Sequence, residues 1–440
     1  MIKKMVKMIL ILSGLLLLMH CGGTKVLTQS ELEQLPREEQ EKALINNIKK
    51  EPLVPNNYIL LSNLYLEENQ DQKAFLILNK GVKEIPQDTR LQFMFGQLAV
   101  KQGKLKDGYG AFLNVLNSPD GYTYKDRIAA YVQEQYSVQQ ITTDPADDAY
   151  PVFAPDGESI YFQSYRNGNW DIYRKNIING EITQITTAES DEELPWVMAD
   201  GNFLLYTSNE LDKRPVSYLS KSRNIYKLDL TNNKVTPLTS TLANDWLARS
   251  NQQNTHIAFV SDRMDQRKVA ISEKYSQIFI MEPNGDFQLN ITDAEANHGG
   301  PVFSQNGRYL YFDSNKEGNF GIYRYSFTTE KTAGIFIEPG NDNVAPSVSP
   351  DDSSLVFFSN RDGNFELYRL NLTDNQLQRL TTNPASDLNP VFSPDGTKIV
   401  FFSNRSGNYD VYLLDLTQPA ASITMNELIK TMTNLVNTMN

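Results

Sequence analysis

The chain has 440 residues but only one cysteine, Cys21, and three histidines. One cysteine cannot form an intramolecular disulfide and cannot build a structural metal site of cysteines. So few histidines also fail to supply the cluster that a metal-dependent or base-catalysed reaction would need. A Gly-x-Ser-x-Gly motif, which marks the nucleophile of many hydrolases, is absent as well. We therefore expect no enzymatic activity, no cofactor and no bound metal.

Positive charge is also scarce. The chain carries 41 Lys and Arg against 53 Asp and Glu, a formal net charge of −12. An acidic chain without a basic stripe does not favour binding to a phosphate backbone, so we expect no nucleic-acid partner. The content of 40% hydrophobic and 21% charged residues is typical of a globular protein.

The sequence does contain a repeat. The stretch "PVFSPDGTKIVFFSNRSGNYDVYLLDL" (390–416) reads as three short strands, separated by the turn sequences SPDG and SGN. Similar segments occupy 151–177, 301–327 and 346–372, and two less regular copies begin at 195 and near 248. Six copies at a spacing of about 44 residues are typical of a β-propeller. We predict a mainly β fold, with a six-bladed propeller over 137–417.

A fourth strand separates successive copies, as in "EITQITT" (181–187), but none follows the last copy. A matching segment, "SVQQITT" (137–143), instead precedes the first copy. We predict that 137–143 completes the last blade and closes the ring, which leaves no unpaired edge there.

Residues 31–136 read as helices that precede the propeller. Small residues recur 34 positions apart, as at Ser62 and Gly96 and at Ala74 and Gly108. This period resembles tetratricopeptide repeats, which stack paired helices. The concave face of such a stack is a candidate peptide-binding groove. Residues 418–440 form a tail that contains a further helix-like segment.

The N-terminus resembles that of a bacterial lipoprotein. Residues 1–20 combine a basic start with an apolar run of about a dozen residues, which is the layout of a signal peptide. The resemblance implies that Cys21 is lipidated and that 21–30 link the anchor to the fold. His20 departs from the small residue usual before that cysteine, and an ordinary signal peptide is the alternative. Gly22, where an inner-membrane retention signal has Asp, favours the outer membrane.

The propeller repeats resemble those of the TolB-type six-bladed propellers, whose motif reads roughly Pro-x-Phe-Ser-Pro-Asp-Gly-x-x-Ile-x-Phe-x-Ser-Asn-Arg. The match is strongest in the first, fourth, fifth and sixth copies. The resemblance implies a non-catalytic scaffold that binds proteins or peptides of the bacterial cell envelope. Two features differ from TolB: helices like tetratricopeptide repeats replace its α/β domain, and TolB itself is soluble in the periplasm.

Two groups of residues are candidate partner-binding sites. One polar residue lies three positions before the leading position of each copy, which predicts a largely acidic ring at one mouth of the channel: Asp148, Glu192, Asp245, His298, Asn343 and Asp387. An acidic mouth could attract a basic peptide, or alternatively a glycan or a cation. These residues could instead be structural, cross-linked by the repeated arginines Arg166, Arg263, Arg361 and Arg405.

The second candidate is a basic ridge on two long hairpins in the second and third copies, 209–223 and 262–276. Departures from a repeat are where function often resides, although drift in tolerated insertions would give the same pattern. The ridge residues are Lys213, Arg214, Lys221, Arg223, Arg267, Lys268 and Lys274.

Overall fold

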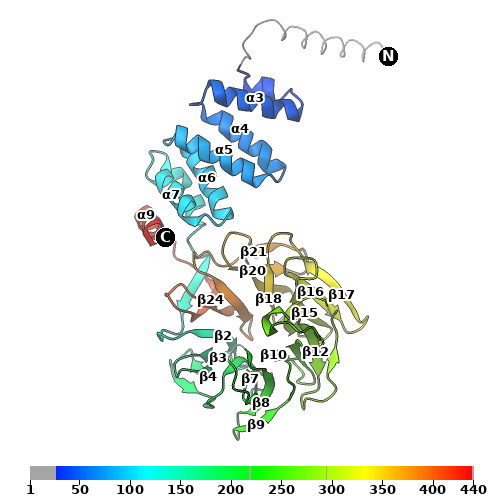
Figure 1. Cartoon of the computed structure of the whole chain (residues 1–440). Helices are drawn as coiled ribbons and strands as arrows, with labels where there is room; N and C mark the ends of the chain where they lie inside the picture. The colour runs from blue at the N-terminus through cyan, green and yellow to red at the C-terminus, as the bar shows by residue number, and fades with distance from the viewer. Residues whose placement is uncertain (1–25, 218–219, 294, 439–440) are drawn as a thin grey trace, which may run out of the picture. The chain divides into compact units, whose positions relative to one another are not determined.

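The computed structural model describes residues 26–217, 220–293 and 295–438 (Figure 1). They form two compact units, each considered by itself below. The propeller unit covers Asp126–Leu428, and the helical unit holds the described residues before it together with those from Ile429 onwards. None of the described helices has the length and apolar character needed to cross a membrane. Cys21 and the signal-like segment lie outside the described residues.

The propeller consists of six antiparallel four-stranded sheets, as the repeat predicts. The first three blades contain β2 (Asp148–Phe153), β3 (Ser159–Ser164), β4 (Asp171–Asn176) and β5 (Ile182–Gln184); β6 (Glu192–Val197), β7 (Phe203–Ser208), β8 (Asn224–Asp229) and β9 (Lys234–Pro237); and β10 (Asp245–Ser250), β11 (Ile257–Ser261), β12 (Gln277–Met281) and β13 (Leu289–Asn290). The last three contain β14 (His298–Phe303), β15 (Tyr309–Ser314), β16 (Gly321–Ser326) and β17 (Lys331–Phe336); β18 (Asn343–Val348), β19 (Ser354–Ser359), β20 (Glu366–Asn371) and β21 (Leu377–Arg379); and β22 (Asp387–Phe392), β23 (Lys398–Ser403) and β24 (Asp410–Pro419) with β1 (Tyr136–Gln140).

The ring closes through a strand from the N-terminal side. β1 pairs antiparallel with β24, with Val138 opposite Leu414 and Gln139 opposite Leu413. The first strand of each blade contacts the first strands of both neighbouring blades, from β2 round to β22 and back to β2. These six strands are therefore the innermost ones, and they surround the central channel.

Each innermost strand is irregular at the same place. In β2 the pairing with β3 shifts register between Ala149 and Val152, and the other five first strands shift at the matching position. One residue of each bulge has a φ between +50° and +56°: Tyr150, Leu194, Leu247, Gly300, Ala345 and Asn389. Glycine adopts this conformation freely and asparagine readily, whereas other residues pay about 1–2 kcal/mol, so the four blades with Tyr150, Leu194, Leu247 and Ala345 accept strain here. A bulge re-aims the side chains on either side of it.

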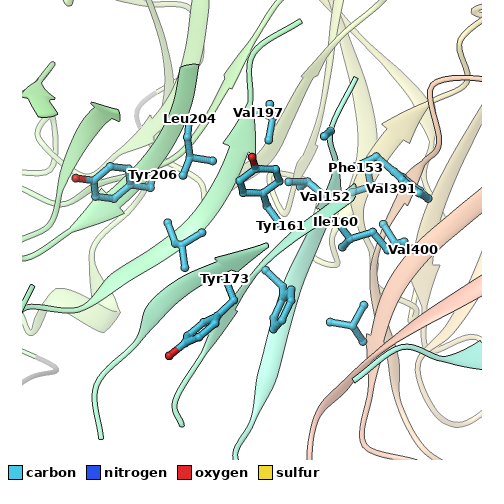
Figure 2. Close-up of a cluster of buried hydrophobic side chains, with 14 of the residues drawn as sticks. Val152, Phe153, Ile160, Tyr161, Tyr173, Val197, Leu204, Tyr206, Val391 and Val400 are labelled. Atoms are coloured by element: carbon cyan, nitrogen blue, oxygen red, sulfur yellow. The ribbon is translucent and has the colours of Figure 1, made fainter. Parts of the chain in front are cut away.

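Hydrophobic side chains fill the space between neighbouring blades. The second strands are buried along nearly their whole length, as expected for strands covered on both faces. Figure 2 shows such a cluster, in which Ile160 and Tyr161 of β3 lie among Val197 of β6 and Val400 of β23. Adjacent blades thus share one core, which fixes the ring and its channel.

The helical unit contains two helix pairs offset by one period. α4 begins at Pro55 and α6 at Thr89, and α5 begins at Asp71 and α7 at Leu105, so both members are displaced by 34 residues. A Cβ on Gly96 would lie 2.6 Å from the Phe112 ring, so glycine here permits the close approach of α6 and α7. The helices of this unit are α2 (Gln29–Leu32), α3 (Arg37–Lys50), α4 (Pro55–Glu67), α5 (Asp71–Glu84), α6 (Thr89–Lys101), α7 (Leu105–Leu116), η1 (Gly121–Tyr124) and the part of α9 (Met425–Thr438) from Ile429 onwards. All but the first residue of α8 (Lys125–Ala129) falls in the propeller unit.

α9 forms from the tail that the sequence marked as helix-like. Its residues from Ile429 onwards cluster with the helical unit. Met432 is fully buried, as is Leu428 one turn before it. The final helix is therefore a packed element of the fold.

Candidate functional site

The six residues predicted to form an acidic mouth each begin the first strand of a blade, but all are buried, with at most 3% of their surface exposed. Three of the carboxylates accept hydrogen bonds from the repeated arginines. Nη2 of Arg166, Arg263 and Arg405 lies 3.1, 2.7 and 2.6 Å from a carboxylate oxygen of Asp148, Asp245 and Asp387. The side chains of this ring are therefore enclosed by the fold, and these three pairs have the arrangement that the structural alternative describes.

The remaining ring positions are also enclosed. Glu192 has no arginine partner among the described residues. It accepts hydrogen bonds from Ser190 (2.6 Å) and Ser208 (3.2 Å), and burial raises its pKa to about 7. Burial lowers the pKa of His298 to about 4, so its imidazole is neutral at pH 7. Asn343 is fully buried, and Arg361 pairs with Glu338 in its place. Among the described residues, no three His, Cys, Asp or Glu side chains are grouped so as to hold a metal ion.

The repeated arginines are held on a second side by aromatic rings. The guanidinium carbon of Arg166 lies 4.4 Å from the ring centroid of Tyr173, and that of Arg263 lies 4.8 Å from Phe279. Stacking on the third strand and pairing with the first strand lock the guanidinium groups of Arg166 and Arg263 in place. These arginines cross-link their blades and are not available to a partner.

The basic ridge is less basic than its sequence suggests. Nε of Arg214 lies 2.8 and 3.0 Å from the two carboxylate oxygens of Asp212, and Arg267 binds Asp265 in the same way at 3.0 Å to each oxygen. Arg223 pairs with Glu193 at 2.9 Å. Three of the seven predicted charges are thus neutralised by neighbouring carboxylates.

The other ridge residues differ in exposure. Lys213 and Lys268 are exposed, whereas Lys221 and Lys274 are partly buried. Lys274 donates a hydrogen bond to the carbonyl of Asp265 at 3.1 Å. The two hairpins join β7 to β8 and β11 to β12 in adjacent blades. They share an Asp-x-Arg arrangement, readable as "LDKR" and "MDQR", that the sequence analysis missed.

An open cavity lies at the other end of the innermost strands. Its volume is about 500 Å³, and each of the six blades contributes to its wall. We call it the funnel. The residues that line it are Phe153, Pro155, Trp196, Val197, Ala199, Ser250, Asn251, Gln252, Val302, Phe303, Ser304, Gln305, Ser347, Val348, Pro350, Val391, Phe392, Ser393 and Pro394.

The funnel combines apolar walls with uncharged hydrogen-bonding groups. Phenylalanine, tryptophan, valine and proline supply the apolar surface, while serine, asparagine and glutamine offer hydroxyls and amides. None of the lining residues that the structure describes is ionisable. In the sequence the SPDG stretches read only as turns. The structure shows that six such turns, with the strand ends before them, surround one cavity.

A family model described as "TolB beta propeller domain" matches residues 123–222 and 337–436. These two segments are similar in sequence to that propeller domain. Among solved structures, the chain resembles TolB from Acinetobacter baumannii at 16% identity, covering 62% of this chain and 64% of that one with a TM-score of 0.45.

Enzymes occur among the similar structures too. An oligogalacturonate lyase from Vibrio parahaemolyticus is 15% identical over 64% of this chain and 93% of its own, with a TM-score of 0.44. The tricorn protease is 12% identical over 64% of this chain and 27% of its own, with a TM-score of 0.49. Similarity at this level carries no information about activity.

Proposed function

We propose that the protein is a non-catalytic scaffold of the bacterial cell envelope, which binds a segment of a partner protein in the funnel. One observation carries this proposal: all six blades line a cavity of about 500 Å³, whose wall consists of apolar side chains, hydroxyls and amides. Apolar pockets with a few uncharged polar groups suit a peptide, because they bury its side chains and still satisfy its backbone.

The same wall argues against chemistry in the funnel. General acid–base catalysis needs a titratable side chain within hydrogen-bond reach of the substrate, and a serine nucleophile needs a base. Ser250, Ser304, Ser347 and Ser393 line the funnel, yet no histidine, carboxylate or lysine does so among the described lining residues. Binding is therefore the role that these residues support.

An affinity purification from cell envelopes tests the funnel. Gln252 is exposed in the funnel wall, so Gln252→Trp would fill the cavity without disturbing the core. Asn202→Trp is the matched control, because Asn202 is an exposed turn residue outside the funnel wall. We expect the wild type and Asn202→Trp to retain a defined partner that Gln252→Trp loses. Equal retention of the partner by all three proteins would contradict binding in the funnel. Recovery of a glycan alone would favour the glycan-binding alternative.

The proposal also includes a lipid anchor at Cys21, with the outer membrane as its location. It rests on the basic start, the apolar run and the lone cysteine that follows. The Cys21→Ala variant should move from the membrane fraction to the soluble fraction, because one acyl-bearing residue is the only anchor proposed. A variant that stays with the membrane and still carries its full N-terminal segment would refute lipidation as the means of attachment.

A further inference from the structure

Arg249, on β10, departs from the propeller repeat. The matching position is valine in three blades, Val152, Val302 and Val391, and Trp196 and Ser347 in the other two. Arg249 lines a small internal cavity of about 10 Å³ among the innermost strands. An arginine among uncharged counterparts, facing the channel, is a local exception that the fold itself does not require.

The guanidinium of Arg249 lacks a protein counter-ion among the residues that the structure describes. Its Nε is buried without a hydrogen-bond partner. Its contact is with Trp196, whose ring centroid lies 4.4 Å from the guanidinium carbon. Arg166, Arg263 and Arg405 each meet a buried carboxylate instead. Burial lowers the pKa of Arg249 to about 10, so it stays charged at neutral pH. Arg249 is partly exposed toward the channel while its Nε is buried, so the guanidinium is partly desolvated, and such a charge without a partner is stabilised when an anion completes the site.

The position of Arg249 relates it to the funnel. Trp196, on which it stacks, lines the funnel, and so does the next residue, Ser250. Val391 borders both cavities. The inner cavity has room for about one water-sized group, such as one oxygen of an incoming acid.

We propose that Arg249 binds a carboxylate carried by the segment that occupies the funnel, either its C-terminus or an Asp or Glu side chain. The proposal rests on the proposed function, because it takes the funnel as the route of entry. A guanidinium offers a planar fork of N–H donors that fits a carboxylate. The funnel wall would hold the apolar part of the segment, and Arg249 would select for negative charge at its innermost point.

Thermal unfolding of the full chain with acetate as the probe tests this site without any partner. Sodium acetate is compared with sodium chloride at constant ionic strength for the wild type, Arg249→Met and Arg324→Met. Arg324 is the matched control, since its guanidinium carbon also lies 4.4 Å from an aromatic centroid, that of Tyr309, but outside the described channel lining. We expect acetate to raise the Tm of the wild type and of Arg324→Met above the value in chloride, and to leave Arg249→Met unchanged.

Two outcomes would overturn the proposal. Acetate could raise the Tm of Arg249→Met as much as that of the wild type, or the wild type could have the same Tm in acetate and in chloride. Should Arg249→Met fail to fold, Arg249→Lys keeps the charge but loses the fork, and its acetate response should be smaller than that of the wild type. An undiminished response would contradict the assignment. The acetate experiment needs no partner, so the two proposals can fail separately. If the wild type shows no acetate response but still captures a partner, only the Arg249 site is refuted. If the wild type responds to acetate but captures no partner, only the scaffold is refuted.

Discussion

At the scale of single residues, the buried pair of Asp245 and Arg263 shows why a repeated charge need not be a binding site. The two side chains lie 2.7 Å apart, and Asp245 is fully buried. Removing the cation leaves a buried carboxylate without its partner, so Arg263→Met should lower the free energy of unfolding by about 3–5 kcal/mol. Urea denaturation measures the change. In Asp245→Asn/Arg263→Met the loss should be smaller than in the single variant; an equal or greater loss would contradict a paired charge.

Asp313 is a buried carboxyl of a different kind. It has no ion pair among the described residues; its Oδ2 accepts a hydrogen bond from the Ala345 N–H at 2.9 Å, and burial raises its pKa to about 7. Between its unfolded pKa near 4 and its folded pKa, the folded state holds a proton that the unfolded state has lost. The stability that this carboxyl contributes is therefore complete below about pH 4 and is lost as the pH rises through 7.

The variant Asp313→Asn tests this linkage, because it keeps the shape of the side chain and removes the titration. Relative to the wild type, Asp313→Asn should gain about 2 kcal/mol of unfolding free energy between pH 5 and pH 8. Other buried acids, such as Glu192, titrate in both proteins and cancel in the difference. A difference independent of pH would show that Asp313 does not hold a proton in the folded state.

At the scale of elements, much of the propeller could be predicted from the sequence. Turn residues in "SPDG", followed by branched and aromatic runs, mark strands directly, and a missing fourth strand after the last copy identifies the closing segment. The structure has that segment as Tyr136–Gln140 on β24. The side of the strand on which Asp148 lies could not be predicted. Tyr150 has a positive φ and interrupts the alternation of side chains between Asp148 and Pro151. Nor could the funnel be predicted, because it depends on the six strand ends meeting in space.

The closing strand offers its own test. Val138 packs against the core of the last blade, whereas its neighbour Gln139 is exposed. Val138→Asp should cost about 2 kcal/mol of unfolding free energy, because it places a charge against apolar side chains. Gln139→Asp, on the opposite face of the same strand, should cost almost nothing. Similar losses in chemical denaturation of the two variants would contradict the observed facing of β1.

At the scale of the whole molecule, the propeller provides a rigid channel whose two ends differ. At one end, buried pairs such as Asp387 with Arg405 link the first strand of a blade to the turn between its second and third strands. At the other end, uncharged groups surround the funnel, and Arg249, which has no ion pair among the described residues, lies deeper in the channel. The repeated charges thus hold the fold together, whereas we propose binding for the funnel, next to which Arg249 breaks the repeat.

Site-specific photo-crosslinking in living cells tests this central claim most directly. A photoreactive phenylalanine analogue replaces Gln252 in the funnel wall, or Asn202 as the control on an exposed turn, and mass spectrometry identifies the adduct. The account predicts a discrete protein adduct at position 252, with the crosslinked peptide carrying a free C-terminus or an acidic side chain, and none at position 202. No adduct at 252 above the level at 202 would contradict the claim that the funnel binds a partner protein.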